Sequence, residues 1–469
     1  MTQITADYLV VGGGAMGMAF IDELITDTDA TIALVDKHHQ VGGHWNDAYP
    51  YVRLHQPSAF YGVNSKDLGS NVVDQTGWNK GLYELATNSE VCAYFDQVMQ
   101  QTYLPSGRLQ YFPMCEFDWD AATPQFKSLV SGETYEVVSK KIVNATYMNV
   151  TVPSMRPPPY PVSDGVDCIA PNDLPGVSGQ YDEYVVIGAG KTGMDACLFL
   201  LKNGVGADRI RWVMPRDSWI FDRSFIQPGK EFANRIGQNQ VEQLKAAAAA
   251  EDLDDLLNKS AATGFIMRFD DEVWPTMWRC ATVTSAELEQ LRKIKGVVRK
   301  GRVTEIKAQE IVLEQGVEPT SGQVLHIDCT ADGLERRPQV PVFNGERITL
   351  QSVRTCQQVF SAAFIGHIEA TYPDADEAKN ELCTPVPHPD DNRDFVRCNL
   401  ANSVNAARWS SEPGLSEWLL HARLDGFSDP ELLPDLSDPE VLAQHQENQQ
   451  QMRSLAEAAN ANMQRILAE

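Results

Sequence analysis

Two short apolar runs near the N-terminus are the first clear pattern in this sequence. Residues 7–11 and 31–35 are each short and apolar, and a helix-like stretch at 18–25 lies between them. Short apolar runs bounded by turn residues are typical of buried strands. The order strand, helix, strand predicts one unit of a parallel α/β sheet.

The same pattern recurs in the middle of the chain. Residues 184–187 predict a strand, a helix follows through residue 201, and residues 209–214 predict a second strand. A proline-rich stretch at 151–179 precedes this unit, and consecutive prolines cannot continue a helix or a central strand. That stretch therefore predicts a crossing between domains.

Each unit also contains a G-x-G-x-x-G turn, at 12–17 and 188–193. Together these patterns predict an α/β fold with two Rossmann-like dinucleotide-binding domains, the second inserted into a discontinuous first. The predicted limits are 1–155 for the first part of one domain, 156–325 for the inserted domain, and 326–469 for the returning part with the C-terminal helices. A polar, alanine-rich stretch at about 229–263 predicts a helical insertion.

Other segments have recognisable periodicity. Val91, Tyr94, Phe95 and Val98 fall on one face of a helix predicted at 88–103. Further predicted elements are strands within 109–146, a helix over 285–295 that begins at Ser285, strands at 297–299, 301–306 and 310–313, and a polar terminal helix at 440–469.

Each strand–helix unit contains a glycine turn of the form G-x-G-x-x-G. In the first, Gly12 permits the tight turn, Gly14 lets the backbone approach a pyrophosphate, and Gly17 allows the helix to pack closely on the strand. Asp36 ends the second strand, where a carboxylate accepts ribose hydroxyls. The alternative is a glycine turn that binds nothing. The cofactor-binding residues predicted here are Gly12, Gly14, Met16, Gly17, Asp36 and Lys37.

The second turn differs from the first in its charge. Arg216 follows the second strand in place of an acid, and a guanidinium suits the 2′-phosphate of NADPH better than the free ribose of NADH. The alternatives are a solvated surface arginine and a vestigial turn without nucleotide. The predicted NADPH-binding residues are Gly188, Gly190, Lys191, Thr192, Gly193 and Arg216.

The segment after Asp36 contains a denser motif. Val-Gly-Gly-His-Trp at 41–45 is followed by Tyr-Pro-Tyr-Val-Arg-Leu-His-Gln-Pro-Ser at 49–58. This run resembles the flavin-containing monooxygenases and Baeyer–Villiger monooxygenases, in which an acid–x5–Gly-Gly-x-Trp segment precedes a Tyr-Pro-x-x-Arg-like turn. A glycine- and proline-rich loop with aromatics packed in the core is the alternative.

The resemblance implies a cofactor pair and a reaction. It implies FAD in the first site, with Gly43, His44, Trp45 and Gln56 near the flavin, and NADPH in the second. It further implies that O₂ forms a C4a-peroxyflavin, which oxygenates a nitrogen, sulfur or carbonyl centre of a small organic substrate. Residues 358–367 resemble the family's late strand, whose end borders the flavin.

Two residues are candidates for the chemistry. His55 falls where the family has an Asn or Asp facing the flavin, so its imidazole is predicted to hydrogen-bond a peroxide or act as acid or base. Arg53 is predicted to stabilise negative charge. A core histidine and a structural arginine are the alternatives.

One departure from the family keeps other functions open. The family signature F-x-G-x-x-x-H-x-x-x-W is absent before residue 184. A flavin dehydrogenase or reductase without oxygenation is one alternative, and a non-catalytic flavin-binding protein is another.

The composition of the chain limits the kinds of partner and the compartment that we expect for this protein. The formal net charge of −25 argues against nucleic acid and anionic membranes. No signal peptide and no apolar run of membrane-span length are seen, so we expect a cytoplasmic protein. Nine scattered cysteines without a C-x-x-C or C-x4-C pair predict free thiols and exclude disulfide reductases. No histidine motif predicts a metal site, and a homodimer stays open.

Overall fold

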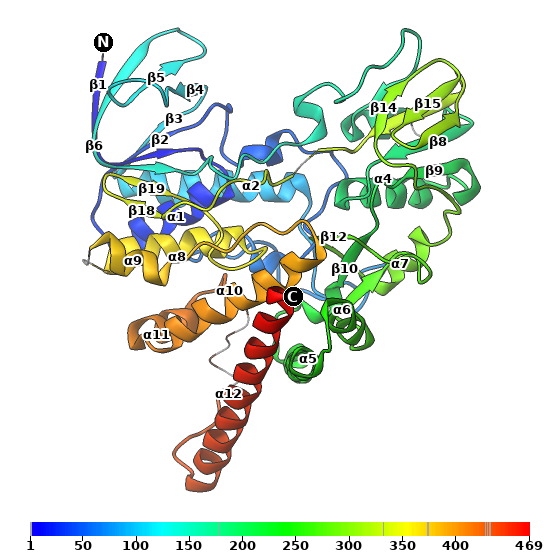
Figure 1. Cartoon of the computed structure of the whole chain (residues 1–469). Coiled ribbons are helices and arrows are strands. Elements are labelled where there is room, and N and C mark those ends of the chain that lie inside the picture. Colours follow the sequence, from blue (N-terminus) through cyan, green and yellow to red (C-terminus); the bar gives the residue numbers. More distant parts are fainter. Residues whose placement is uncertain are drawn as a thin grey trace.

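Two sheets with central parallel strands organise the computed structural model, which describes residues 2–177, 179–331, 333–372, 375–426, 428, 430 and 433–469 (Figure 1). The first sheet has the order β18-β19-β6-β1-β2-β3, and β1 runs parallel to both β2 and β6. Its members are β1 (Thr2–Val11), β2 (Ile32–Val35), β3 (Leu109–Phe112), β6 (Thr134–Asn144), β18 (Phe343–Asn344) and β19 (Arg347–Thr349). The strands β4 (Cys115–Phe117) and β5 (Gln125–Ser128) extend it beside β6.

The second sheet has the order β13-β9-β8-β17-β7, with all neighbours parallel. Its members are β7 (Cys168–Ile169), β8 (Glu183–Ile187), β9 (Ile210–Val213), β13 (Gly296–Val298) and β17 (Val324–Asp328). All five strands fall between β6 and β18 of the first sheet in the sequence. The predicted α/β class, with one parallel-sheet unit inserted into another, is therefore confirmed.

A helix follows the first strand of each glycine-turn unit. The helices α1 (Ala15–Asp27) and α4 (Lys191–Lys202) both begin at the fourth position of their glycine motif, directly after Gly14 and Gly190. Both are flanked by buried strands, since Ile32–Val35 is wholly buried and so is most of Glu183–Ile187. The turns thus lie at the carboxyl ends of central parallel strands, where ligands of open α/β sheets bind.

Two smaller sheets and two helices extend the second unit. The small sheets are β10 (Ser218–Asp222), β11 (Ile266–Arg268) and β12 (Met277–Val283), and β14 (Val303–Ile306), β15 (Glu310–Leu313) and β16 (Gly316–Pro319). The helices α5 (Lys230–Ala249) and α6 (Leu253–Ala262) occupy the segment predicted as a helical insertion.

The remaining α-helices are mostly near the C-terminus. They are α2 (Asn88–Val98), α3 (Leu174–Val177), α7 (Ser285–Leu291), α8 (Gln358–Thr371), α9 (Asp376–Leu382), α10 (Asn392–Ser410), α11 (Pro413–His421) and α12 (Pro439–Ala468). The buried residues of α2 are Val91, Tyr94, Phe95 and Val98, as predicted, and a π-helical turn continues it. Among the described helices none has the length and apolarity to span a membrane.

The prediction of a strand at 358–367 was wrong, because this segment is helix α8. The run is apolar on every face, and such a run does not distinguish a buried strand from a buried helix. In the structure α8 packs along α1. A side chain at Gly366 would lie 3.0 Å from the Phe20 carbonyl oxygen, so the glycine permits this close approach.

The helix α7 begins at Ser285, as predicted, but ends at Leu291 rather than at residue 295. Thr284 is its N-cap and forms a capping box with Glu287. The C-terminal helix α12 is less solvated than its composition suggests. Ala459, Met463 and Ile466 are buried with residues of α5 and α6, while its first turns are exposed (Figure 1).

Candidate functional site

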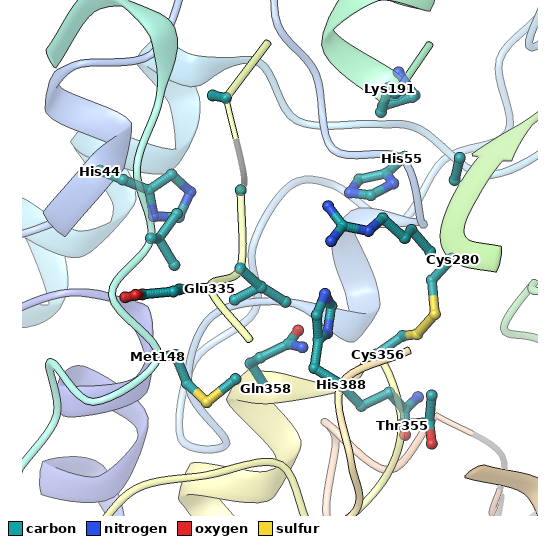
Figure 2. Close-up of a pocket in the computed structure, with 18 of the residues that line it drawn as sticks. His44, His55, Met148, Lys191, Cys280, Glu335, Thr355, Cys356, Gln358 and His388 are labelled. Atoms are coloured by element: carbon teal, nitrogen blue, oxygen red, sulfur yellow. A yellow bond between two sulfur atoms is a disulfide. The ribbon is translucent and has the colours of Figure 1, made fainter. Parts of the chain in front are cut away.

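A single large cavity of about 2090 Å³ is lined by residues of both glycine turns (Figure 2). The predicted residues that line it are Gly12, Gly14, Met16, Asp36, Lys37, Gly43, His44, Trp45, Arg53, His55, Gln56, Gly188, Gly190, Lys191, Thr192 and Arg216. Two parts of the chain that are far apart in sequence thus line one cavity.

Gly17 and Gly193 lie outside the cavity lining. A Cβ at Gly17 would lie 2.0 Å from the carbonyl oxygen of Gly12, and one at Gly193 would lie 2.1 Å from that of Gly188. Both distances are far inside van der Waals contact, so these glycines let each helix pack against its turn.

The N-termini of α1 and α4 fit a phosphate group. Their N-cap residues are Gly14 and Gly190, neither helix has a side-chain cap, and neither has an acid in its first turn. The first N–H groups of a helix have no partner within the helix and favour anions. A Cβ at Gly190 would meet nothing within 4 Å, so the second turn leaves space in front of it.

Asp36 is held in place at the end of β2. Its Oδ2 accepts a hydrogen bond from the Gly13 N–H, and its Oδ1 accepts from the backbone N–H of His38 at 2.7 Å. The His38 ring bridges Asp36 and Asp47, with Nδ1 3.0 Å from Asp36 and Nε2 2.8 Å from Asp47. A carboxylate oxygen has two lone pairs, so Oδ2 can still accept a ribose hydroxyl.

The predicted flavin-loop residues form one wall. Gly43 packs against Gly14, since a Cβ on Gly43 would lie 2.8 Å from the Gly14 Cα. The Trp45 indole Nε1 donates to the Tyr61 hydroxyl at 2.7 Å. Burial is the main cause that lowers the pKa of His44 to about 4.

His55 and Arg53 are exposed towards the cavity. The pKa of His55 is lowered to about 3, first because the cavity walls around it desolvate its ring and then by the charges of Lys191 and Arg223. Its imidazole is therefore neutral at ordinary pH. A neutral ring of such low basicity can donate and accept hydrogen bonds, but it is a weak general base.

Lys191 and Asp195 connect the second turn to the first unit. The two side chains form an ion pair one helical turn apart, and the Tyr49 hydroxyl donates to the other oxygen of Asp195 at 2.7 Å. The helix that carries the second glycine turn is thereby tied to the flavin-like loop.

Arg216 lines the cavity but has a partner in the protein. Its Nη2 lies 2.8 Å from Oδ1 of Asp390, and Arg279 Nε lies 2.8 Å from the same oxygen. The hydrogen bond from Arg216 is the largest cause that lowers the pKa of Asp390 to about 2, and the charge of Arg279 adds to it. Arg216 is not a freely solvated surface arginine.

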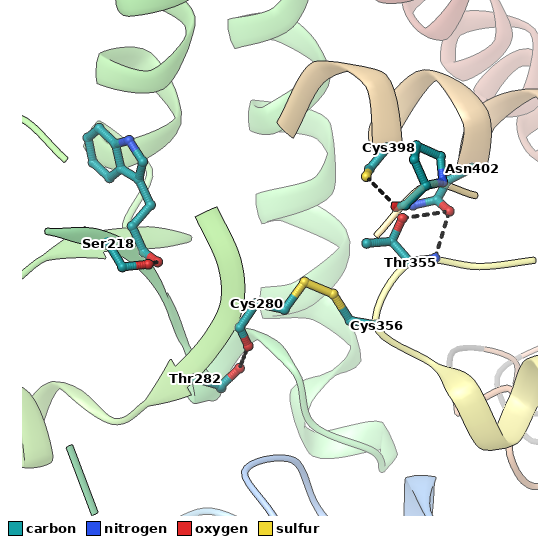
Figure 3. Close-up of a disulfide and its surroundings, with 9 residues drawn as sticks. Ser218, Cys280, Thr282, Thr355, Cys356, Cys398 and Asn402 are labelled. Carbon is teal, nitrogen blue, oxygen red and sulfur yellow. Dashed lines mark hydrogen bonds between the residues drawn. A yellow bond between two sulfur atoms is a disulfide. The ribbon is translucent and has the colours of Figure 1, made fainter. Parts of the chain in front are cut away.

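The prediction of nine free thiols was wrong, because Cys280 and Cys356 form a disulfide (Figure 3). The ground on which the sequence excluded disulfide reductases, the absence of a cysteine pair, is thereby removed. The two cysteines are 76 residues apart, so no local spacing motif marks them. Both line the cavity. Only the packing of β12 against the loop before α8 brings them together.

We expect the pKa of His38 to lie above the ordinary value of 6.5 and the pKa of His55 to lie below it. Asp36 raises the pKa of His38, so His38 should stay charged above pH 6.5. His55 should stay neutral down to at least pH 5. Because folding raises the pKa of His38, the stability that His38 contributes is lost as pH rises through its folded pKa. Because folding lowers the pKa of His55, the stability that His55 contributes is lost as pH falls below 6.5. NMR of the ring protons, assigned with His38→Gln and His55→Gln, measures both; a His55 midpoint near 6.5 would contradict this picture.

The fold and cavity define an α/β protein with two G-x-G-x-x-G turns that line one cavity. No protein-family model matches the chain. It is 52% identical over 434 residues, 92% of this chain and 80% of the relative, to "Uncharacterized protein Rv2000" of Mycobacterium tuberculosis (strain ATCC 25618 / H37Rv). "Uncharacterized protein Mb2023" of Mycobacterium bovis (strain ATCC BAA-935 / AF2122/97) matches equally. The chain belongs to the family of these mycobacterial proteins.

Several solved flavin monooxygenases are similar to the chain at low identity. A flavin-containing monooxygenase from Stenotrophomonas maltophilia shares 12% identity and a TM-score of 0.47, covering 79% of this chain and 98% of that one. NADP⁺-bound cyclohexanone monooxygenase from Rhodococcus sp. Phi1 has 16% sequence identity and a TM-score of 0.49. The match covers 82% of this chain and 89% of that one. An NADP-bound steroid monooxygenase has 12% sequence identity and a TM-score of 0.49. The match covers 78% of this chain and 85% of that one.

Proposed function

We propose that this chain is an FAD- and NADPH-dependent oxidoreductase of the monooxygenase type, which oxygenates a small organic substrate with O₂. The observation that carries the proposal is the one cavity shared by two glycine turns, each in front of an uncapped helix N-terminus. In this proposal residues 1–155 and 326–469 bind FAD, and residues 156–325 bind NADPH.

The residues present fit both nucleotides. Gly14 and the N-terminus of α1 face the place of one pyrophosphate, with Asp36 positioned for a ribose. Gly190 and the N-terminus of α4 face the other, with Lys191 at its first turn. Bound FAD supplies the electron transfer and oxygen activation, with NADPH as the hydride donor.

The chain's own groups would orient the reactants and exclude water. His55 offers a neutral imidazole to a polar atom in the cavity, and Arg53 offers a cation on the same stretch. Both units contribute walls to the cavity, and these walls would limit the access of solvent to the reacting centre.

The test is cofactor binding followed by turnover. We expect purified protein to gain thermal stability with FAD, and Asp36→Ala to lose most of that gain, because binding to the native state stabilises it by mass action. Aerobic NADPH oxidation is then measured with a panel of amines, sulfides and ketones. Substrate-dependent NADPH consumption with an oxygenated product supports the proposal. Failure of the wild-type protein to bind FAD would contradict it.

A flavin reductase without oxygenation is the second candidate. The observation that favours it is the disulfide in the cavity wall, a group that can accept electrons. NADPH consumption that yields only reduced acceptor, or hydrogen peroxide in fixed ratio to NADPH whatever the substrate, would select this candidate.

We expect Arg216→Ala to raise the KM for NADPH roughly tenfold and to change that for NADH less than about twofold, because a 2′-phosphate loses a charged hydrogen bond. Arg279→Ala is the matched control, since it removes a guanidinium from the same carboxylate of Asp390. Steady-state kinetics with both nucleotides decide the matter. Equal effects of the two variants, or equal effects on the two nucleotides, would refute the assignment of Arg216 to the phosphate.

A further inference from the structure

The disulfide between Cys280 and Cys356 is placed as a reaction centre would be. We propose that it is redox-active: it takes two electrons from the reduced cofactor of the cavity and passes them to a disulfide substrate of low molecular mass. This inference rests on the proposed binding of FAD and NADPH, but it does not require oxygenation.

The position of the disulfide is the first argument. Cys280 and Cys356 line the same cavity as Gly14 and Gly190. Figure 2 shows the bonded sulfurs in the cavity wall together with His55 and Lys191. The disulfide therefore lies in the wall of the same space that is proposed to hold the nucleotides.

The backbone at the two cysteines is the second argument. Cys280 has φ 58° and Cys356 has φ 61°, so both adopt the left-handed region that side chains other than glycine rarely occupy. Each such residue costs about 1–2 kcal/mol, and such residues cluster at functional sites. Cys280 also lies in an irregularity of β12, where the pairing with β10 shifts register between Trp219 and Phe221. A bulge of this kind redirects a side chain, often next to an active site.

The residues that precede the two cysteines, Thr355 and Arg279, are fixed by hydrogen bonds and an ion pair. Beside Cys356, the Thr355 N–H and hydroxyl donate to Asn402 Oδ1 at 3.0 and 3.2 Å (Figure 3). Beside Cys280, Arg279 pairs with Asp390 at 2.8 Å. These bonds hold the chain beside each cysteine in place, which favours formation of the disulfide again after cleavage.

The other cysteines are poor candidates for this chemistry. Burial raises the pKa of each of the seven free thiols, and the thiolate is the reactive form. They are Cys92, Cys115, Cys168, Cys197, Cys329, Cys383 and Cys398. In a reducing compartment, such as the sequence predicts, a disulfide that forms is usually catalytic or redox-sensing.

The proposed reaction balances in two halves. The S–S bond of Cys280–Cys356 accepts two electrons, which NADPH supplies through the flavin, and two protons, and two thiols form. One thiol then attacks a sulfur of the substrate R–S–S–R and expels the first R–SH, which gives a mixed disulfide. The second cysteine attacks that bond, releases the second R–SH and restores Cys280–Cys356. Because Cys280 is buried in the cavity wall, only a small disulfide can approach it.

An anaerobic titration of the FAD-loaded protein with NADPH tests the first half. We expect the wild-type protein to take up four electrons for each flavin, two of them by the disulfide. After NADPH treatment, alkylation and mass spectrometry should find labels on both Cys280 and Cys356, which are unlabelled before treatment. Cys280→Ser and Cys356→Ser should take up two electrons for each flavin, while Cys92→Ser should behave like the wild type.

The outcomes separate this inference from the proposed function. A flavin that is fully reduced while Cys280 and Cys356 remain unlabelled overturns the inference and leaves cofactor binding standing. A chain that binds no flavin overturns both. If a serine variant does not fold, the electron count and the labelling of the wild-type protein decide the inference.

Turnover tests the second half with bis(2-hydroxyethyl) disulfide as the probe. We expect NADPH oxidation that releases two thiols for each NADPH consumed, and a rate at least about a hundredfold lower in either serine variant. A labelled, reducible pair without any thiol release would overturn the substrate assignment.

Discussion

Gly193→Ala is expected to lower the free energy of unfolding by about 3 kcal/mol and to abolish NADPH binding, whereas Gly190→Ala should weaken NADPH binding alone. A Cβ at residue 193 would lie 2.1 Å from the Gly188 carbonyl oxygen. That oxygen also accepts the Trp212 indole N–H at 2.8 Å, so a shift of the turn breaks a buried hydrogen bond. The start of α4 cannot keep its place on the sheet.

Gly190 offers a matched control three residues away in the same turn. Its backbone is extended, with φ −79°, and a Cβ there would meet nothing within 4 Å. Alanine should therefore cost less than about 1 kcal/mol of stability. The added methyl group fills the space proposed for the pyrophosphate, so NADPH affinity should fall roughly tenfold or more. Denaturant unfolding and NADPH titration compare the two variants. Similar unfolding midpoints, or unchanged affinity in Gly190→Ala, would count against the two assignments.

Arg223→Ala is expected to cost about 3–5 kcal/mol of stability, because it leaves buried partners without their cation. Arg223 is 1% exposed. Its guanidinium donates to the His55 carbonyl at 2.9 Å and to Asn79 Oδ1 at 3.0 Å, and it pairs with Glu287 at 3.0 Å. It thus connects the loop that carries His55 with the unit that carries the second glycine turn.

An exposed arginine nearby provides the control. Arg235 donates to the Ser224 hydroxyl and lies over the Phe225 ring, but its side chain is exposed. Arg235→Ala should cost less than about 1 kcal/mol. Chemical denaturation measures both variants. Arg223→Ala should also raise the pKa of His55, because one of the cations that lower it is gone. Equal losses of stability in the two variants would show that Arg223 does not support this interface.

Local sequence determined the units of this fold. The apolar runs around Gly12 and Gly188 specify buried strands, and each glycine turn leads into a helix whose start it leaves uncapped. The glycine positions follow from sterics within six residues, so they can be assigned from spacing alone. Gly17 and Gly193 are such cases, since their contacts are with carbonyls of their own turns.

Tertiary structure decided the features that join distant segments. Residues 358–367 are mostly apolar, and their packing along α1 decides that they form a helix. The pairing of Arg216 with Asp390 joins residues 174 apart, so its partner is invisible to any local pattern.

The candidate site divides in the same way. The sequence by itself determined the two glycine turns and Asp36, because short-range backbone geometry requires those residue types at those positions. Only the tertiary structure decided that both turns face one cavity, that His55 is neutral there, and that Cys280 and Cys356 are bonded in its wall. The physical reason is that burial, charge and disulfide pairing depend on which distant segments meet in space.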